Sequence, residues 1–213
     1  MAVLRRRQPD LTILLDNVHK PHNFSAILRS ADAVGVHEAH AVWPDPSMRV
    51  HRLTSGGAGK WLRLRTHRDL ASAAEALHAT GHRLVAAHPD ADAVSYLEVD
   101  YTEPVAFVLG AELKGLSESA LALADHHVVI PMAGHVESLN VSVAAALLLF
   151  EARRQREAAG MYADARLEAD TFHRTLFEWA HPQIADYCQR HDRAYPAMDE
   201  DGEVIGNDWR ASR

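Results

Sequence analysis

The sequence has almost no cysteine: Cys188 is the single thiol among 213 residues. One thiol cannot form an intrachain disulfide, and it cannot supply the several ligands of a cysteine-based zinc or iron–sulfur site. The fifteen histidines are scattered along the chain. His37 and His40 lack the i, i+4 spacing that places two metal ligands on one helix face. We therefore expect no metal site.

Long apolar runs are also missing. The longest, residues 143–150, is far shorter than the about 20 residues that a membrane span needs. The amino-terminal segment MAVLRRRQPD is basic but has no apolar stretch behind it, so it does not resemble a signal peptide. Hydrophobic residues make up 47% and charged residues 24% of the chain, as in ordinary globular proteins. The sequence predicts a cytoplasmic protein without a membrane partner.

The common nucleotide-binding motifs are absent as well. No G-x-G-x-x-G sequence follows a candidate strand. The segment SGGAGKW at 55–61 is similar to a phosphate-binding P-loop. However, Thr54 and Trp61 stand where that motif needs glycine and Ser or Thr. We therefore reject a P-loop.

The net charge of −7 argues against a polyanionic partner, but the charges are unevenly distributed. Residues 49–68 contain six Lys or Arg and no Asp or Glu. Because the local field rather than the total charge attracts a polyanion, this segment is a candidate phosphate-contacting surface. An ordinary solvated basic face is the alternative. The candidate RNA-binding residues are Arg49, Arg52, Lys60, Arg63 and Arg65.

Short apolar segments alternate with helical patterns along the first 160 residues. The apolar segments predict strands at 11–16, 38–43, 62–66, 82–88, 104–109 and 126–130. The helical patterns predict helices at 23–34, 68–79 and 140–160, and a short one after Ser117. This alternation predicts an α/β fold with a mostly parallel sheet covered by helices on both faces.

The carboxyl-terminal part has a different pattern. Residues 161–190 are helical in pattern but interrupted by Pro182, and residues 191–213 have the composition of an irregular tail. We expect a helical extension beyond the α/β domain.

The helix expected at 140–160 is apolar almost all round over its first part. One small sheet cannot cover so many apolar side chains, and a second copy of the chain is the economical way to cover them. The sequence therefore predicts a homodimer in which this helix packs against its counterpart. The side chains concerned are Val141, Val143, Ala144, Leu147, Leu148 and Phe150.

Three segments carry residues that packing alone does not explain. NFSAILR (23–29) opens a helix, LGAELKGLSE (109–118) follows the most apolar strand, and IPMAGHVESLN (130–140) precedes the long helix. Each has an ordinary reading: Asn23 and Asn140 as helix N-caps, Arg29 paired with Asp32, and the second segment as a tight loop. The ends of parallel strands are, however, where open α/β sheets bind ligands.

These segments resemble the three motifs of the SpoU/TrmH ribose 2′-O-methyltransferases, which belong to the SPOUT superfamily. Residues 6–44 and the tail at 194–209 extend the resemblance to nearly the whole chain, and 163–190 match least. The resemblance implies a SPOUT-type methyltransferase domain at 1–160, with a short extension at 1–10 and a deep trefoil knot. It also implies that residues 161–213 help to bind RNA.

The resemblance further implies the reaction and its residues. A methyl group would pass from S-adenosylmethionine to the ribose 2′-hydroxyl of guanosine-18 in the D loop of tRNA. The implied catalytic residues are Asn23, Arg29, Glu112, Ser138 and Asn140. The implied cofactor-binding residues are His88, Leu109, Gly110, Ile130, Met132, Ser138 and Leu139.

The role of Arg29 is constrained by its chemistry. The resemblance suggests this arginine as the base that removes the hydroxyl proton, yet a guanidinium stays protonated in proteins. We therefore expect an electrostatic role on ribose and phosphate, and the base stays open. Two alternatives remain: methylation of another tRNA or rRNA ribose, and a catalytically silent RNA-binding member of the same fold.

Overall fold

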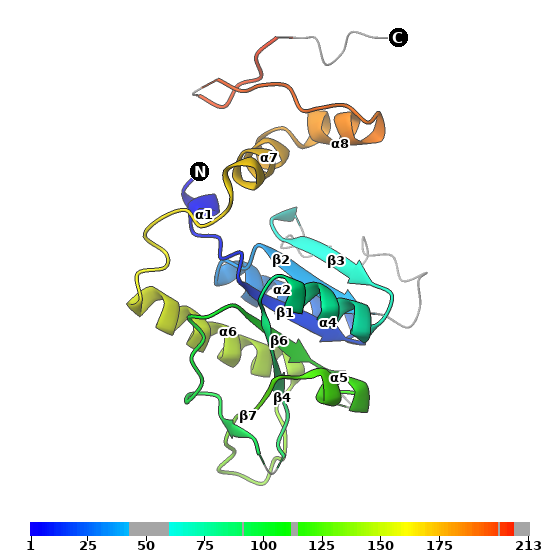
Figure 1. Ribbon diagram of the computed structural model, residues 1–213, viewed down its shortest axis with the longest axis vertical. Coiled ribbons are helices and arrows are strands. Elements are labelled where there is room, and N and C mark those ends of the chain that lie inside the picture. Colours follow the sequence, from blue (N-terminus) through cyan, green and yellow to red (C-terminus); the bar gives the residue numbers. More distant parts are fainter. Residues whose placement is uncertain (43–59, 91, 112–114, 200, 207–213) are drawn as a thin grey trace.

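The computed structural model describes residues 1–42, 60–90, 92–111, 115–199 and 201–206. Within these ranges one parallel sheet has the strand order β3-β2-β1-β6-β4-β7-β5 (Figure 1). The α/β fold with a parallel sheet is thus confirmed. The strands are β1 (Leu11–Asp16), β2 (Glu38–Val42), β3 (Arg63–His67), β4 (Arg83–Ala87), β5 (Val94–Ser95), β6 (Val105–Leu109) and β7 (His126–Val129).

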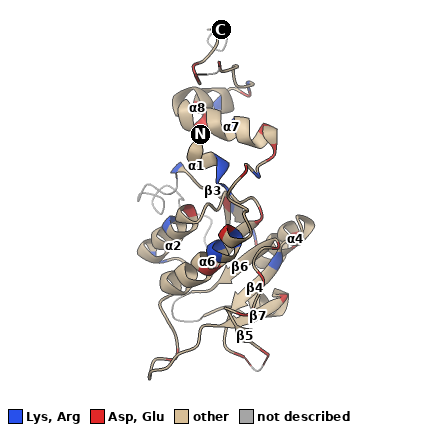
Figure 2. Cartoon of the chain, turned by 90° about the vertical axis from the view of Figure 1, so that its left-hand side faces the viewer, with Lys and Arg blue, Asp and Glu red and all other residues tan. Residues whose placement is uncertain are grey.

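Helices pack on both faces of this sheet. Along β1, Leu11, Ile13 and Leu15 point to the α2 and α6 side, and Leu14 points to the α4 and α5 side, as the two-residue period of a strand requires. Figure 2 shows α2 and α6 side by side on their face. The described helices are α1 (Ala2–Arg5), α2 (Pro21–Ala33), α4 (Leu70–Ala79), α5 (Glu118–Leu123), α6 (Val141–Ala158), α7 (Ala169–Ala180) and α8 (Pro182–Arg190).

Helix starts follow local chemistry in most places. The side chain of Asp69 accepts a hydrogen bond from Ser72 N at 2.8 Å and caps α4, and Ser117 caps α5 in the same way. The expected cap at Asn23 is wrong. The helix α2 begins two residues earlier, at Pro21, because proline has no N–H to satisfy and its fixed φ suits the first helical position.

The order of the strands reverses between β1 and β6, which are paired in parallel at the centre of the sheet. Open α/β sheets bind ligands in the crevice outside the carboxyl ends of their strands, at such a switch point. Residues 17–23 directly follow β1, and residues 110–117 directly follow β6. The fold therefore brings two of the three unusual segments to one place.

The apolar residues of α6 lie in two different environments, the core of the chain and its surface. Ala145, Leu148, Leu149 and Ala152 are fully buried in the core of their own chain. The exposed apolar side chains are Val143, Leu147 and Phe150, with exposed fractions of 46%, 36% and 46%. Leu148 and Val141 are therefore wrongly placed in the expected dimer surface, because both are buried in the core of their own chain.

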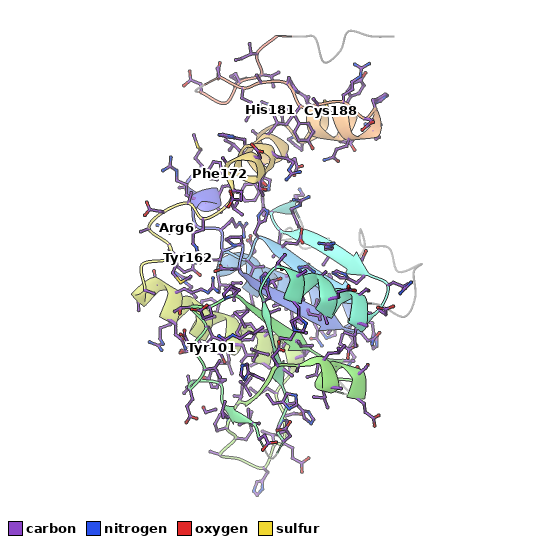
Figure 3. All side chains as sticks on the ribbon, viewed as in Figure 1. Arg6, Tyr101, Tyr162, Phe172, His181 and Cys188 are labelled. Atoms are coloured by element: carbon purple, nitrogen blue, oxygen red, sulfur yellow. The ribbon has the colours of Figure 1, made fainter. Side chains whose placement is uncertain are left out.

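The carboxyl-terminal helices α7 and α8 extend from the sheet beside the amino-terminal helix α1 (Figure 1), as expected from the interruption at Pro182. Arg166 binds Asp10 at 2.7 Å, and the hydroxyl of Tyr162 (labelled in Figure 3) donates to the carbonyl of Val34 at 2.6 Å. The short elements α1 and β5 lie outside the prediction, because segments this short show no periodicity. The trefoil knot stays a prediction.

Candidate active site

The side chains of Asn23 and Asn140 meet where α2 and α6 begin. Nδ2 of Asn140 donates a hydrogen bond to Oδ1 of Asn23 at 3.2 Å, and Asn23 is almost completely buried. Oδ1 of Asn140 accepts from Ser142 N at 2.8 Å, so Asn140 is the N-cap of α6. The ordinary interpretation of Asn140 is thus correct but incomplete, because its amide also joins the first and third unusual segments.

Arg29 lies farther along α2 and is exposed. Asn23 and Arg29 are six positions apart, which at 3.6 residues per turn puts them on different faces of the helix. The ordinary pairing of Arg29 with Asp32 is not formed, because Asp32 binds Arg7 at 2.5 Å. Within the described part of the chain, the guanidinium of Arg29 makes no hydrogen bond or ion pair. It is available to a bound ligand.

The described residues at the two ends of the second unusual segment lie close together after β6. Ala111 and Gly115 form an isolated bridge, and a Cβ atom at Gly110 would overlap the carbonyl oxygen of Gly115. Oδ2 of Asp16, at the end of β1, accepts from Ser117 N at 3.0 Å and ties this segment to the switch point. Glu112 lies outside the described residues.

A cavity of about 310 Å³ lies at the carboxyl ends of β4 and β7. It brings together five of the residues predicted to bind the cofactor: His88, Ile130, Met132, Ser138 and Leu139. Leu109 is buried, and neither it nor Gly110 is among the lining residues. Sequence reasoning missed Glu137, which also lines the cavity, although a carboxylate suits a cationic ligand.

The geometry fits a small amphipathic ligand. The volume is at the lower end of the range for ligand pockets, and apolar walls with a few polar groups are their usual lining. The loop after β4 is fixed by a hydrogen bond between His127 and Asp90. That hydrogen bond holds the pKa of the Asp90 carboxyl below its usual range. This side of the sheet therefore has a preformed pocket, and its lining residue Leu139 directly precedes Asn140 in the chain.

The basic segment lies at the opposite edge of the sheet. Lys60, Arg63 and Arg65 are exposed along and before β3, whereas β7 is five places away in the strand order. Neighbouring strands are about 4.8 Å apart, so roughly 24 Å separates β3 from β7. Arg49 and Arg52 lie outside the described residues. The structure does not bring the basic side chains to the cavity.

A second hollow lies on the exposed side of α6. It has a volume of about 410 Å³ and is lined by Tyr96, Val143, Ala146, Leu147, Phe150 and Glu151.

In the described residues, no cluster of three or more His, Cys, Asp or Glu could hold a metal ion, and no helix has the length and apolarity of a membrane span.

Comparison with known proteins identifies the family. The profile of the SpoU rRNA methylase family matches residues 10–150, and that of the SpoU carboxyl-terminal region matches residues 154–207. The chain belongs to the SpoU methylase family. This confirms the resemblance seen in the three motifs, and the second profile covers the segment that resembled the family least.

Several members of the SpoU methylase family are similar over most of their length. The tRNA (guanosine(18)-2′-O)-methyltransferase of Escherichia coli is 46% identical over 99% of this chain and 93% of its own. The enzyme of the same name from Thermus thermophilus is 56% identical over 83% of this chain and 91% of its own.

Solved SpoU structures show the same fold. A TrmH/SpoU tRNA modifying enzyme of Aquifex aeolicus has a TM-score of 0.79 and 37% identity, covering 86% of this chain and 93% of its own. The SpoU methyltransferase AviRb of Streptomyces viridochromogenes, solved with the cofactor AdoMet, has a TM-score of 0.60 and 31% identity. It covers 72% of this chain and 62% of its own.

Proposed function

We propose that this chain methylates the ribose 2′-hydroxyl of guanosine-18 in tRNA, with S-adenosylmethionine as methyl donor. The observation that carries the proposal is the junction of Asn23 and Asn140 beside the cavity at the ends of β4 and β7. The choice of substrate is supported by the relatives that are similar over nearly their full length and are named for this reaction. No feature of the described residues favours ribosomal RNA over tRNA.

The residues of the cavity fit the methyl donor. When bound, S-adenosylmethionine supplies an electrophilic methyl group on a cationic sulfur. Ile130, Met132 and Leu139 would contact its apolar parts, and His88 and Ser138 offer polar groups. Glu137 provides a negative charge that favours a cation. Leu109 and Gly110 would help to bind the methyl donor through the backbone that follows β6.

The catalytic residues divide into two tasks. Asn23 and Asn140 would orient the ribose, because a side-chain amide offers both a hydrogen-bond donor and an acceptor. Arg29 would stabilise the negative charge that develops on the 2′-oxygen and contact the adjacent phosphate with its planar fork. Ser138 and Glu112 complete the set that the family motifs assign. Arg29 is an electrostatic group here, because a guanidinium does not give up its proton.

RNA binding is assigned to the basic surface and to the carboxyl-terminal part. The described side chains of Lys60, Arg63 and Arg65 are exposed, and together with Arg49 and Arg52 they would contact phosphates. Residues 161–213 would add RNA contacts beyond the methyltransferase domain at 1–160. Phosphate contacts fix the position of the RNA without reading its sequence.

The catalytic unit is proposed to be a homodimer. Val143, Leu147 and Phe150 expose a continuous apolar strip of α6, and a two-fold axis would pack it against its copy. Because α2 lies beside α6 (Figure 2), Arg29 of one chain would then lie near the partner. A cytoplasmic location, where tRNA is modified, fits this function.

The test is methyl transfer to two matched tRNA transcripts. One has guanosine at position 18, and the other has 2′-deoxyguanosine there and is otherwise identical. We expect one methyl group per molecule in the first and none in the second. Equal labelling of both transcripts would show that another ribose is the target. No labelling of tRNA, with labelling of rRNA, would support the ribosomal alternative, and RNA binding without any transfer would support the silent one.

A further inference from the structure

Trp61 is a large aromatic side chain that the proposed active site does not use. It directly precedes Leu62 and β3, and 44% of its surface is exposed. Most tryptophans in folded proteins are largely buried. An exposed indole within the basic segment at 49–68 therefore needs a reason.

The backbone and ring of Trp61 are held in place. Nη2 of Arg7 donates to the carbonyl oxygen of Trp61 at 3.0 Å, and Arg7 itself is fully buried. The indole ring packs edge to face on Trp179 of α7, with ring centres 5.3 Å apart and planes at 83°. The Arg7 guanidinium lies over the Trp179 ring at 5.2 Å. Trp61 is thus a pre-positioned platform, not a freely moving side chain.

Positive charge surrounds this platform. Arg63 and Arg65 are at alternate positions of β3, so they point to the same side of the strand, and Lys60 and Trp61 lie just before it. The charged ends of Lys60, Arg63 and Arg65 form no hydrogen bond or ion pair with any described residue. The acid in register with Arg63 is Glu38, which is half-buried. The surface therefore suits a polyanion.

We infer that Trp61 stacks on an unpaired base of the tRNA substrate. Single-stranded nucleic acids are bound where basic side chains follow the backbone and aromatic rings accept the bases. Bases within a duplex do not offer a free face, so the platform selects loops over paired arms. The inference rests on the proposed function, because it assumes that tRNA is the ligand.

The contact is remote from the chemistry. Trp61 precedes β3 at one edge of the sheet, and the cavity lies at the ends of β4 and β7 toward the other (Figure 1). With roughly 20 Å or more between them, one nucleotide cannot reach both. Trp61 therefore acts on tRNA binding and not on methyl transfer itself.

The first experiment separates binding from turnover. Trp61→Ala should raise KM for tRNA by about tenfold or more, as expected for loss of a stacked base, and should lower kcat less than twofold. Trp61→Phe should recover most of the affinity. Leu97→Ala, at another exposed apolar side chain, is the control and should not change KM. Thermal unfolding shows which variants are folded.

A second experiment does not need the alanine variant. Replacing Trp43, Trp179 and Trp209 by Phe leaves Trp61 as the single tryptophan. Its fluorescence should be quenched by oligouridylate and much less by an RNA duplex of equal length. Equal quenching by both RNAs, or none by either, would overturn the inference.

The outcomes also separate this inference from the proposed function. If the wild type methylates guanosine-18 and Trp61→Ala keeps its KM, the stacking contact is wrong and the function stands. If the wild type does not methylate tRNA, the proposed function fails, and the oligouridylate result alone decides whether Trp61 binds unpaired RNA.

Discussion

Asn140 and Asn23 are 117 positions apart in the sequence and joined by one hydrogen bond between their side-chain amides. The same Asn140 side chain caps α6 through Ser142. One residue therefore has two separable tasks: it stabilises a helix terminus, and it holds the amide of Asn23 in a defined orientation. Substitutions can distinguish these tasks.

Asn140→Ser should keep the cap and lose the contact with Asn23, because serine supplies an acceptor but no amide N–H. We expect methyl transfer to fall at least tenfold while the unfolding temperature changes little. Asn140→Ala should lose both tasks and cost a further about 1 kcal/mol of stability. Equal activity of Asn140→Ser and wild type would show that the Asn23 contact is dispensable.

Arg29→Ala should abolish methyl transfer and leave the affinity for S-adenosylmethionine nearly unchanged, because its guanidinium is not part of the cavity lining. Arg29→Lys should not restore activity if the planar fork is required. Equilibrium binding of the methyl donor and single-turnover transfer to tRNA are the two measurements. Turnover by Arg29→Ala within a few-fold of wild type would contradict the assignment.

Gly110→Ala should destabilise the turn after β6, since the added Cβ would meet the backbone of Gly115 and Leu116, which cannot yield as a flexible side chain does. We expect weaker binding of the methyl donor and a lower unfolding temperature. Gly134→Ala is the matched control, because no atom lies within 4 Å of its added Cβ. A Gly110→Ala variant that binds like the control would show that the turn can relax.

Acid should destabilise the fold through His37. Burial, with added repulsion from Arg63 and Arg7, lowers the pKa of His37 to about 4 from its ordinary 6.5. The unfolded chain therefore binds the proton first, and the free energy of unfolding should fall as the pH drops from about 6.5 to about 4. Among the residues that the structure describes, neither ring nitrogen of His37 has a hydrogen-bond partner. Denaturant titrations should thus show His37→Leu losing part of this pH dependence without losing a hydrogen bond.

Adjacent leucines on α6 should respond differently to a charge. Leu147 is 36% exposed and Leu148 is fully buried. Leu147→Glu should dissociate the proposed dimer and leave each chain folded, whereas Leu148→Glu should unfold it, because a lone buried carboxylate is strongly unfavourable. Sedimentation and circular dichroism separate the two results. A wild-type protein that is monomeric and fully active would exclude the dimer as the catalytic unit.

The sequence was sufficient for the parallel sheet, because apolar runs at 11–16 and 104–109 are typical of strands buried on both faces. It was also sufficient for the short helix after Ser117, because its cap depends only on that residue and the next turn. It was insufficient for Asn23, whose capping chemistry is equally good but whose position is decided by Pro21. Local sequence preference alone does not decide whether the helix begins at Pro21 or after a cap at Asn23.

The exposed side of α6 shows a second limit. The helical pattern marks Leu147 and Leu148 as equally apolar, and only the packing of α2 and the sheet shows which one is already covered. The cavity residues were located from the family motifs, but Glu137 carries no pattern of its own. The contact of Trp61 with Trp179 joins segments more than 100 positions apart, which no local signal reports.

The strand order has a kinetic consequence. The centre of the sheet pairs β1 with β6, whose residues are more than 90 positions apart, and such pairings close late because a long loop must first lose its freedom. The crevice for the methyl donor and the Asn23–Asn140 junction both depend on that central pairing. During refolding, the circular dichroism signal of the helices should therefore return first. Methyl-transfer activity should appear only in the slowest phase.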